Sequence, residues 1–263
     1  MGEVIVITSG KGGVGKTTTT ANIGTGLAAL GHKVVLVDTD IGLRNLDVVL
    51  GLENRIVYDL TNVVHGEVVY KKALIKDKRF ENLYLLPAAQ TKDKTAVTPD
   101  QMYQLCQDLQ QEFDYVLIDC PAGIEQGFKN AIAGANRAIV VTTPEISAVR
   151  DADRIVGLLE AAELQDPRLI INRIRYNMVK SGDMMNIEDI IDILAIDLLG
   201  VVPDDEMVVI TTNKGEAVVQ ENKSISGQAY RNIVKRIKGD EVPLLDLEDG
   251  GFFNKIKKLF IRK

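Results

Sequence analysis

The chain has 263 residues, 46% of them hydrophobic and 26% charged, which is typical of a globular domain large enough to bury its own core. Its net charge of −6 argues against a broad basic face for nucleic acid, and its two cysteines, Cys106 and Cys120, are too few for a disulfide framework or a zinc site, which favours the reducing cytoplasm. The first apolar run leaves no room for a signal peptide, and no run approaches the roughly 20 apolar residues that cross a bilayer.

Seven apolar runs recur along the chain with amphipathic segments between them. Because they are continuously apolar rather than alternating, they predict strands that are buried on both faces. We therefore expect an α/β domain, a mostly parallel twisted sheet with helices on both faces, in which ligands bind at the carboxyl ends of the strands. The strands are predicted at residues 4–7, 34–37, 83–86, 115–118, 138–141, 169–171 and 198–202, and the helices at 18–30, 99–112, 149–163, 187–194 and 225–238.

A glycine-rich loop follows the first strand. Residues 10–17 match the phosphate-binding pattern G-x-x-x-x-G-K-[ST], and the helix after them would turn Ala21, Leu27 and Ala28 inward. The glycines let backbone N–H groups point at phosphate oxygens, and the helix N-terminus adds a partial positive charge. In this motif the lysine reaches the β- and γ-phosphates and the threonine ligates Mg²⁺. The predicted ATP contacts of the loop are Gly10, Lys11, Gly12, Gly13, Val14, Gly15, Lys16, Thr17 and Thr18.

Two acidic motifs each follow a predicted strand and so fall on the same edge as the phosphate loop. Asp38 and Asp40 follow the second strand, and Asp119 follows the fourth. A carboxylate in such a place holds Mg²⁺ directly or through water, and Gly123 lets the loop after Asp119 move toward the γ-phosphate. Thr17, Asp38 and Asp119 are therefore the predicted magnesium ligands. Taken singly, each aspartate also fits a helix cap or a turn.

The generic phosphate-binding pattern does not need a lysine at position 11. With Lys11, the loop resembles that of the ParA/MinD family of deviant Walker-A ATPases, to which the nitrogenase iron protein is also related. The resemblance implies slow hydrolysis of ATP to ADP and phosphate by an ATP-dependent homodimer, in which Lys11 reaches the partner's phosphates as an arginine finger does elsewhere. It also implies that Asp40 positions the attacking water. The predicted catalytic residues are Lys11, Lys16, Asp38, Asp40 and Asp119.

Further stretches make the resemblance more specific and extend it over nearly the whole chain. They point to the septum-positioning members of the family, which implies the division inhibitor MinC and the regulator MinE as partners. These stretches are residues 8–18, 38–47 (DTDIGLRNLD), 73–79, 82–87, 121–125, 144–154 and the basic C-terminal tail.

The resemblance places a partner surface on the helix after Pro144, near Ser147, Arg150, Asp151 and Asp153. A salt-bridged helix start explains the same four residues, and the sequence leaves both interpretations open.

The resemblance also places the adenine at the ends of two late strands, near Asn172 and Arg173 and near Pro203, Asp204 and Asp205. Asn and Asp in such places also simply terminate elements. Residues 213–216 come close to the guanine-binding pattern N-K-x-D, but they end in Glu and follow no strand, so we interpret them as a surface turn.

The charge is concentrated at the C-terminus. Five of the 31 basic residues and no acidic residue lie in 251–263, so the rest of the chain carries a net charge of −11. On a helical wheel five large apolar side chains of this segment share one side, whereas Ile261 falls on the polar side. The pattern predicts an amphipathic helix at the inner surface of the cell membrane, reversibly bound to anionic lipid. A last helix docked on the body is the alternative. The predicted membrane contacts are Phe252, Phe253, Lys255, Ile256, Lys258, Leu259 and Phe260.

The sequence therefore predicts an ATPase domain at 1–238, a polar linker at 239–250 and a membrane-targeting helix at 251–263. One alternative function is a DNA-partition ATPase of the ParA type, which would need basic residues on the body. Another is an iron–sulfur carrier, for which Cys106 and Cys120 lack the spacing of cluster ligands. Flagellar-number ATPases resemble the tail too, but they usually carry a segment before the first strand.

Overall fold

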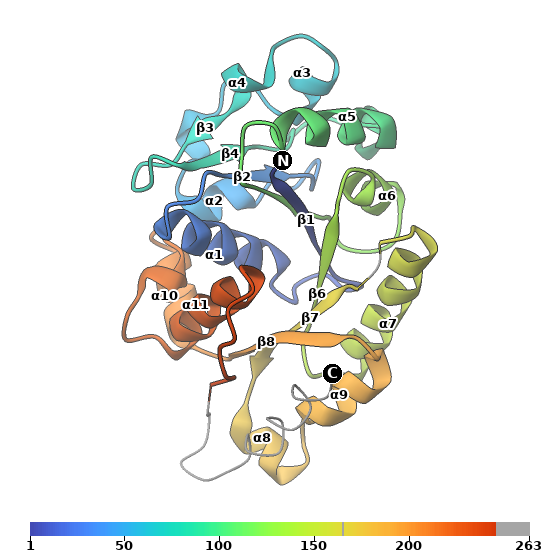
Figure 1. Ribbon diagram of the computed structural model, residues 1–263, viewed down its shortest axis with the longest axis vertical. Helices are drawn as coiled ribbons and strands as arrows, with labels where there is room; N and C mark the ends of the chain where they lie inside the picture. Colours follow the sequence, from blue (N-terminus) through green and yellow to red (C-terminus); the bar gives the residue numbers. More distant parts are fainter. Residues whose placement is uncertain (165, 246–263) are drawn as a thin grey trace.

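The computed structural model describes residues 1–164 and 166–245, and within them eight strands form one sheet (Figure 1). Their order is β3-β4-β2-β5-β1-β6-β7-β8, and all neighbours are parallel except β3, which runs antiparallel to β4 at one edge. The predicted fold class is confirmed. The strands are β1 (Glu3–Thr8), β2 (Val34–Asp38), β3 (Ile75–Lys76), β4 (Leu83–Leu86), β5 (Tyr115–Asp119), β6 (Arg137–Thr142), β7 (Arg168–Ile174) and β8 (Asp197–Pro203).

Each of the seven predicted strands is present. The central strand β1 shows why continuous apolarity marked them: Val4, Ile5, Val6 and Ile7 are all fully buried, because both faces of the sheet are covered. The sequence did not predict β3, since two residues are too few to give a pattern.

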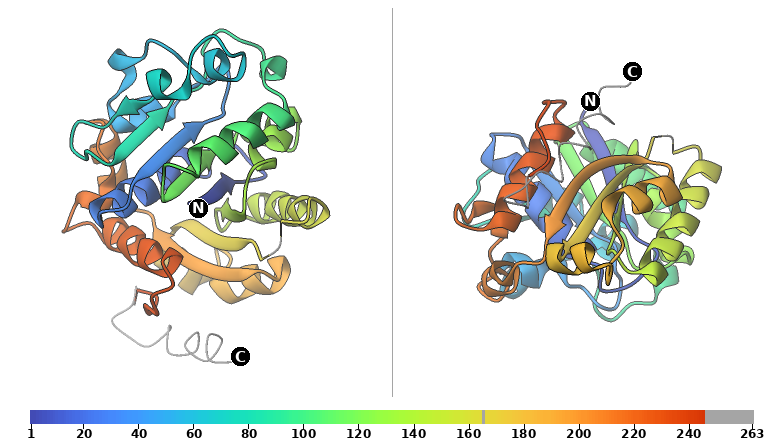
Figure 2. Two further views of the ribbon diagram at one scale, coloured as in Figure 1. Left: turned by 45° about the horizontal axis from the view of Figure 1, so that its top comes forward. Right: turned by 90° about the horizontal axis from the view of Figure 1, so that it is seen from below.

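Helices cover both faces of the sheet, and the strands separate two apolar cores (Figures 1 and 2). One core contains side chains of α1 (Lys16–Ala29), α2 (Leu46–Leu50) and α11 (Ile225–Ile237). The other contains side chains of α5 (Pro99–Leu109), α6 (Gln126–Ile132), α7 (Ile146–Ala161) and α9 (Ile187–Leu194).

Two helix boundaries differ from the prediction in ways that affect the site. α1 begins at Lys16, two residues earlier than predicted, so Lys16 and Thr17 lie in its first turn. α7 begins at Ile146 rather than at residue 149, because Ile146 and Ser147 are exposed and add no inward-facing apolar residue to the pattern on which the prediction relied. α1 is also buried almost all round, since α11 and a 3-10 segment (Val218–Gln220) cover it, so the expected inward set was right but incomplete.

Several short elements escaped the sequence patterns, because one or two turns do not establish a helical period. They are the helices α2, α3 (Leu60–Val64), α4 (Tyr70–Ala73), α6, α8 (Tyr176–Ser181) and α10 (Glu206–Thr212), and the 3-10 segments Glu53–Arg55, Lys94–Ala96 and Val218–Gln220.

The described chain ends against the body. The Arg236 guanidinium donates to the carbonyls of Leu199 in the edge strand β8 and of Val242 and Pro243, at 2.8–2.9 Å. In the first part of the predicted linker, residues 242–245 thus contact the domain, the last two through apolar side chains, whereas residues 239–241 are exposed. The remaining linker and the predicted membrane helix at 251–263 lie outside the described residues. Within the described part, no helix is long and apolar enough to span a bilayer.

Candidate nucleotide-binding site

The phosphate loop joins the central strand β1 to α1. Gly15 is the N-cap of α1 with φ 97°, and no side chain caps this helix start within the described chain. The left-handed backbone at Gly13 (φ 79°) and Gly15 turns the loop sharply, and α1 has no acidic residue in its first turn. Its first N–H groups are thus left for an anionic ligand, the arrangement that phosphate-binding loops use.

Asn172, at the end of β7, holds this loop in place. Its Nδ2 donates to the carbonyl oxygen of Val14 at 2.8 Å, and its Oδ1 accepts from the N–H of Arg173. A Cβ on Gly15 would lie 2.3 Å from Asn172 Nδ2, so a side chain there would push the Asn172 amide away from Val14, in addition to straining φ. The sequence placed Asn172 at a strand end but gave no sign that it supports the loop.

Lys16, Thr17 and Thr20 surround Asp119. Lys16 is 8% exposed, and Thr17 hydrogen-bonds the Asp119 carboxylate. The Thr20 hydroxyl lies 3.0 Å from the Lys16 carbonyl oxygen and 3.2 Å from Asp119 Oδ1, so it donates to one of them at a time. Thr20 was not predicted; its place one helical turn after Lys16 is the signal that could have identified it.

Asp38 and Asp119 are paired in the register of β2 and β5 and are both buried. Burial, and next the charge of Asp119, raise the pKa of Asp38. Burial also raises the pKa of Asp119, against the lowering effect of the Thr17 hydrogen bond and the Lys16 charge. Two buried carboxylates that resist ionising side by side are well suited to a neighbouring cation.

The three predicted magnesium ligands are not equivalent. Hydrogen bonding from Thr17 lowers the pKa of Asp119, whereas Asp38 accepts the N–H of Asp40 on Oδ1 at 2.9 Å and the N–H of Leu46 on Oδ2 at 3.2 Å. In the described residues no group of three or more His, Cys, Asp or Glu side chains could hold a metal by itself. Mg²⁺ would fit here through hydroxyl and carboxylate oxygens, with phosphate and water completing its shell.

Lys11 is exposed, and its Nζ donates to Ser147 Oγ at 2.9 Å in the first turn of α7. A Cβ on Gly10 would collide with the Asp151 backbone at 2.2 Å, so the loop also rests against this helix. The Lys11 ammonium therefore points to α7 of its own chain.

The predicted adenine contacts lie at the ends of β7 and β8, where Asn172 pairs with Val202. Asp204 forms an ion pair with Arg175 at 2.6 Å. Asp205 caps α10; burial alone would raise its pKa, but hydrogen bonds from Ser224, Met207 and Ser226 hold the pKa below its usual range. Arg173 is exposed with φ 57°, and Pro203 accepts from Ser226 Oγ. Adenine binding by this group stays a prediction.

Residues 213–216 form the predicted turn after α10.

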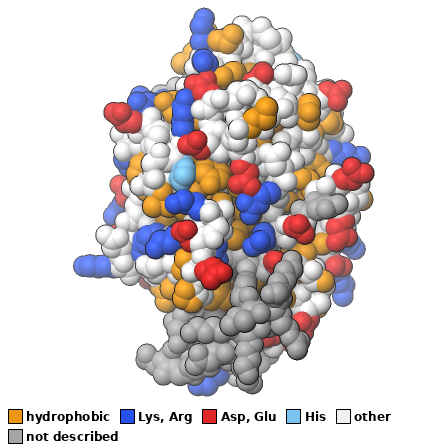
Figure 3. Space-filling model, in the orientation of Figure 1, with side chains coloured by type: hydrophobic (Ala, Val, Ile, Leu, Met, Phe, Trp, Pro, Cys, Tyr) orange, Lys and Arg blue, Asp and Glu red, His pale blue; other side chains and the backbone are white. Residues whose placement is uncertain are grey.

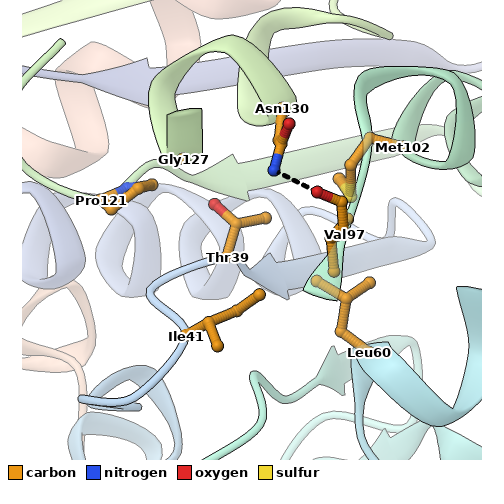
Figure 4. Close-up of a pocket in the computed structure, with 8 residues that line it drawn as sticks. All are labelled: Thr39, Ile41, Leu60, Val97, Met102, Pro121, Gly127 and Asn130. Atoms are coloured by element: carbon orange, nitrogen blue, oxygen red, sulfur yellow. Dashed lines mark hydrogen bonds between the residues drawn. The ribbon is translucent and has the colours of Figure 1, made fainter. Parts of the chain in front are cut away.

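A small pocket lies between the loops that follow β2 and β5 (Figure 4). Thr39 and Ile41 line it from the first loop and Pro121 from the second, and Asn130 donates to the Val97 carbonyl at 2.7 Å in its wall. A Cβ on Gly127 would lie 2.6 Å from Pro121, so α6 packs closely on the second loop. The loops that follow β2 and β5 therefore line the same pocket from two sides.

The α7 surface is accessible at three of the four predicted partner contacts. Ser147, Arg150 and Asp153 are exposed, and Asp151 is half-buried and lies 4.0 Å from Arg154. Both predicted explanations therefore remain open: the start of α7 does carry an ion pair, and it also offers an exposed polar face.

Two features weigh against the alternative functions. Cys106 and Cys120 are buried free thiols whose pKa burial raises to about 12, which does not suit iron–sulfur ligation. On the face shown in Figure 3, acidic and basic side chains are interspersed rather than gathered into a basic field for DNA.

Residues 2–171 match the model of an AAA domain family. The chain is 63% identical to the septum site-determining protein MinD of Bacillus subtilis over 264 residues, covering 99% of this chain and 98% of that protein. A structure of the MinC:MinD cell division protein complex of Aquifex aeolicus matches with a TM-score of 0.86 and 49% identity, over 93% of this chain and 99% of that one. MinD of Pyrococcus horikoshii, solved with Mg-ADP, matches with a TM-score of 0.81 and 33% identity, over 90% and 96%.

Proposed function

This chain belongs to the MinD family of septum site-determining proteins, and on that premise we propose that it is an ATP-hydrolysing switch that positions the division septum. The observation that carries the proposal is the phosphate loop itself. An uncapped helix start with Lys16 in its first turn faces Asp119, and Thr17 connects the two. No other group of described residues brings together an anion site, a cation site and a candidate for orienting water.

In this proposal the loop N–H groups and Lys16 bind the phosphates of ATP. Mg²⁺, when bound beside Thr17 and Asp119, would neutralise charge that develops on the phosphate oxygens. Asp40, on the loop after β2, orients the water that attacks the γ-phosphate. Hydrolysis by one chain is slow, because the Asp40 carboxylate is a weak base.

The same proposal includes an ATP-dependent homodimer. Lys11 is exposed and bound to Ser147 by one hydrogen bond, so little holds it on its own chain. When two chains meet across their phosphate loops, Lys11 leaves Ser147 and reaches the partner's phosphates, where it completes the charge stabilisation that a single chain lacks.

The C-terminal segment is the proposed membrane anchor. Residues 251–263 combine two adjacent phenylalanines with five basic and no acidic side chains, a composition suited to anionic lipid. One such short helix binds weakly, because ordering it offsets much of its apolar burial. Two helices on one dimer gain about 10²–10⁴ in avidity, so ATP binding recruits the protein and hydrolysis releases it.

The proposed protein partners follow from the family. The Aquifex aeolicus relative was solved in complex with MinC, and we infer that this chain recruits the division inhibitor MinC to the membrane. The exposed residues Ser147, Arg150 and Asp153 of α7, with Asp151 beside them, are the proposed contact surface. A regulator of the MinE type would stimulate hydrolysis from there.

Co-sedimentation with anionic vesicles tests the switch. The full chain should sediment with ATP and stay in solution with ADP, and a chain truncated before Gly251 should stay in solution with both. Lys16→Ala removes nucleotide-dependent binding, and Lys11→Ala separates ATP binding, which persists, from dimer formation, which does not. Binding that is indifferent to the nucleotide, or that survives the truncation, contradicts the proposal.

A parallel arm with nonspecific duplex DNA distinguishes the partition-type alternative. Salt-sensitive binding to DNA in the presence of ATP, without binding to vesicles, would favour that function. The expected result is the reverse.

A further inference from the structure

Residues 39–46, here called the 39–46 loop, run from the end of β2 to the first residue of α2 and are tied to Asp38 at both ends. Asp38 Oδ1 accepts the N–H of Asp40 at 2.9 Å, and its Oδ2 accepts the N–H of Leu46 at 3.2 Å. One buried carboxylate therefore defines the start and the finish of the 39–46 loop. Whatever fixes Leu46 also fixes the loop that carries Asp40.

Arg44 and Asp47 lie on either side of Leu46 and form an ion pair. Arg44 Nε is 2.9 Å from Asp47 Oδ2, and the two side chains are 16% and 1% exposed. Leu46 itself is fully buried between them in the sequence. The ion pair thus joins the residues on both sides of Leu46, whose N–H donates to Asp38.

The backbone at Arg44 is held in an unfavourable conformation. Its φ is 45°, in the left-handed region that favours glycine and disfavours a side chain with a Cβ. A residue keeps such a conformation only where its surroundings over-determine it. The contact with Asp47 supplies that constraint.

The Asp47 carboxylate depends on this contact. Neither of its oxygens has a hydrogen-bond partner among the described residues, and neither does Arg44 Nε, so the two buried side chains meet as an ion pair. A buried charge without a partner is strongly destabilising, so the Asp47 carboxylate holds Arg44 in place. The Asp47 backbone in turn belongs to α2, which packs against α1 behind the phosphate loop.

We propose that the buried Arg44–Asp47 pair holds the 39–46 loop in the shape that places Asp40, which makes Arg44 a positioning residue for ATP hydrolysis. The link runs from the pair to Leu46, from Leu46 to Asp38, and from Asp38 to Asp40. A second link is direct, since the Arg44 backbone N–H donates to the Asp40 carbonyl oxygen at 3.0 Å. The kinetic part of this inference rests on the proposed ATPase function, whereas the structural part does not.

The test replaces both charges by apolar side chains, Arg44→Met with Asp47→Leu, which avoids leaving one charge buried alone. ATP hydrolysis is measured on anionic vesicles, with KM and kcat separated, and ADP affinity is measured independently. The expected result is a kcat lowered by about 10- to 100-fold, because a displaced catalytic group loses its alignment, with KM and ADP affinity within about twofold of the parent. A kcat within about twofold of the parent would overturn the proposal.

Hydrogen exchange of the nucleotide-free protein gives a second measurement that does not need activity. In the double variant the amides of Asp40 and Leu46 should exchange at least tenfold faster, while the amides of Val35–Val37 in β2 keep their protection. Unchanged exchange at Asp40 and Leu46 also overturns the proposal. If the parent chain proves not to hydrolyse ATP, the proposed function fails while the exchange result still decides whether the pair holds the loop.

A single substitution covers the case in which the double variant does not fold. Arg44→Lys keeps a cation beside Asp47 but loses the planar guanidinium, so it should fold and show the same two effects at smaller size. The matched control is the pair Arg137–Glu3, which meets at 2.8 Å at the amino ends of β6 and β1, away from the loops that follow the carboxyl ends of the strands. Arg137→Met with Glu3→Leu should leave kcat and the Asp40 and Leu46 exchange rates unchanged.

Discussion

The longer helices start in two different ways, depending on where they lie along the sheet. Those that follow the central strands β1, β5 and β6, namely α1, α6 and α7, begin without a side-chain cap in the described structure. Those at the flanks, α5, α9, α10 and α11, each begin with a side chain that accepts a backbone N–H. The flanking caps are Thr98, Asn186, Asp205 and Ser224.

The two kinds of helix start serve different purposes: capped starts stabilise the fold, and uncapped starts are available to ligands. A capping side chain satisfies a helix start locally and stabilises it by about 1 kcal/mol. An uncapped start such as that of α1 gives up this stabilisation and leaves its N–H groups for a ligand. The starts of α1 and α6 also lie beside the acidic loop that follows β5, so uncapped helix starts and a buried carboxylate meet in one place.

The largest effect is expected at the centre. Lys16→Ala removes the side chain that faces both the phosphate site and Asp119, and should lower ATP hydrolysis by about 10²–10³-fold, as for a lost electrostatic contact to a reacting group. Fluorescent-nucleotide binding and steady-state hydrolysis measure it. Lys180→Ala, at an exposed lysine of α8, is the control. Hydrolysis above a tenth of the parent rate would show that the helix start alone carries the function.

A stability effect is expected next, at Asp38. Since burial raises the folded-state pKa of Asp38 to about 8, the folded chain binds more protons than the unfolded chain as pH rises toward 8, and the free energy of unfolding falls over that range. Asp38→Asn should remove this loss. The nucleotide-free variant should melt above the parent, by an amount on the order of 2 kcal/mol or several degrees near pH 8, and by less at pH 5.

Thermal unfolding at both pH values measures this prediction, with the exposed Asp197→Asn as a control for charge removal alone. A variant that melts below the parent at pH 8 would mean that the two hydrogen bonds to Asp38 outweigh its desolvation. The nucleotide site would then stabilise the fold, contrary to the expectation that the centre of the sheet gives up stability and the flanks supply it.

The Asn172 contact gives a smaller effect. Asn172→Ala removes the donor to the Val14 carbonyl and leaves the phosphate loop without its support from β7. We expect ATP and ADP to bind about tenfold more weakly, the loss typical of one buried hydrogen bond. Titration calorimetry measures both affinities, and Asn177→Ala, at an exposed asparagine, is the control. If only the affinity for ATP fell, or neither affinity changed, Asn172 would not be what supports the phosphate loop.

The fold was largely predictable from the sequence because parallel strands buried on both faces leave a continuous apolar signal. Val34–Val37 and the runs like it were found for that reason, and Asp38 and Asp119 could be placed on one edge as the residues that follow them. The glycine-rich loop carried its own pattern. These features depend on neighbours in the sequence, which a single chain displays.

What the sequence did not show depends on contacts between distant segments. Asn172 supports a loop 158 residues away, and Lys11 meets Ser147 across 136 residues. The Arg44–Asp47 pair is local, but its meaning depends on burial and on a left-handed backbone, neither of which a charged pair three residues apart reveals. Short elements such as α2 escaped for a related reason, since packing rather than periodicity stabilises them.

The smallest effect is expected at a capped helix start on the flank of the sheet, where stability but not nucleotide binding should change. Thr98 begins α5 with a capping box: its side chain accepts the N–H of Gln101, whose side chain accepts the N–H of Thr98. Thr98→Ala should cost about 1 kcal/mol of stability, or roughly 2–4 °C in Tm, because one helix donor loses its partner. Nucleotide affinity and kcat should not change, since the exposed cap belongs to a helix start that offers no donors to a ligand.

Gln101→Ala should reproduce the stability loss, because Gln101 forms the other half of the same capping box. A Thr98→Ala variant that kept its Tm but lost nucleotide affinity would show that the flanks set the geometry of the centre, and the two kinds of helix start would then not be independent.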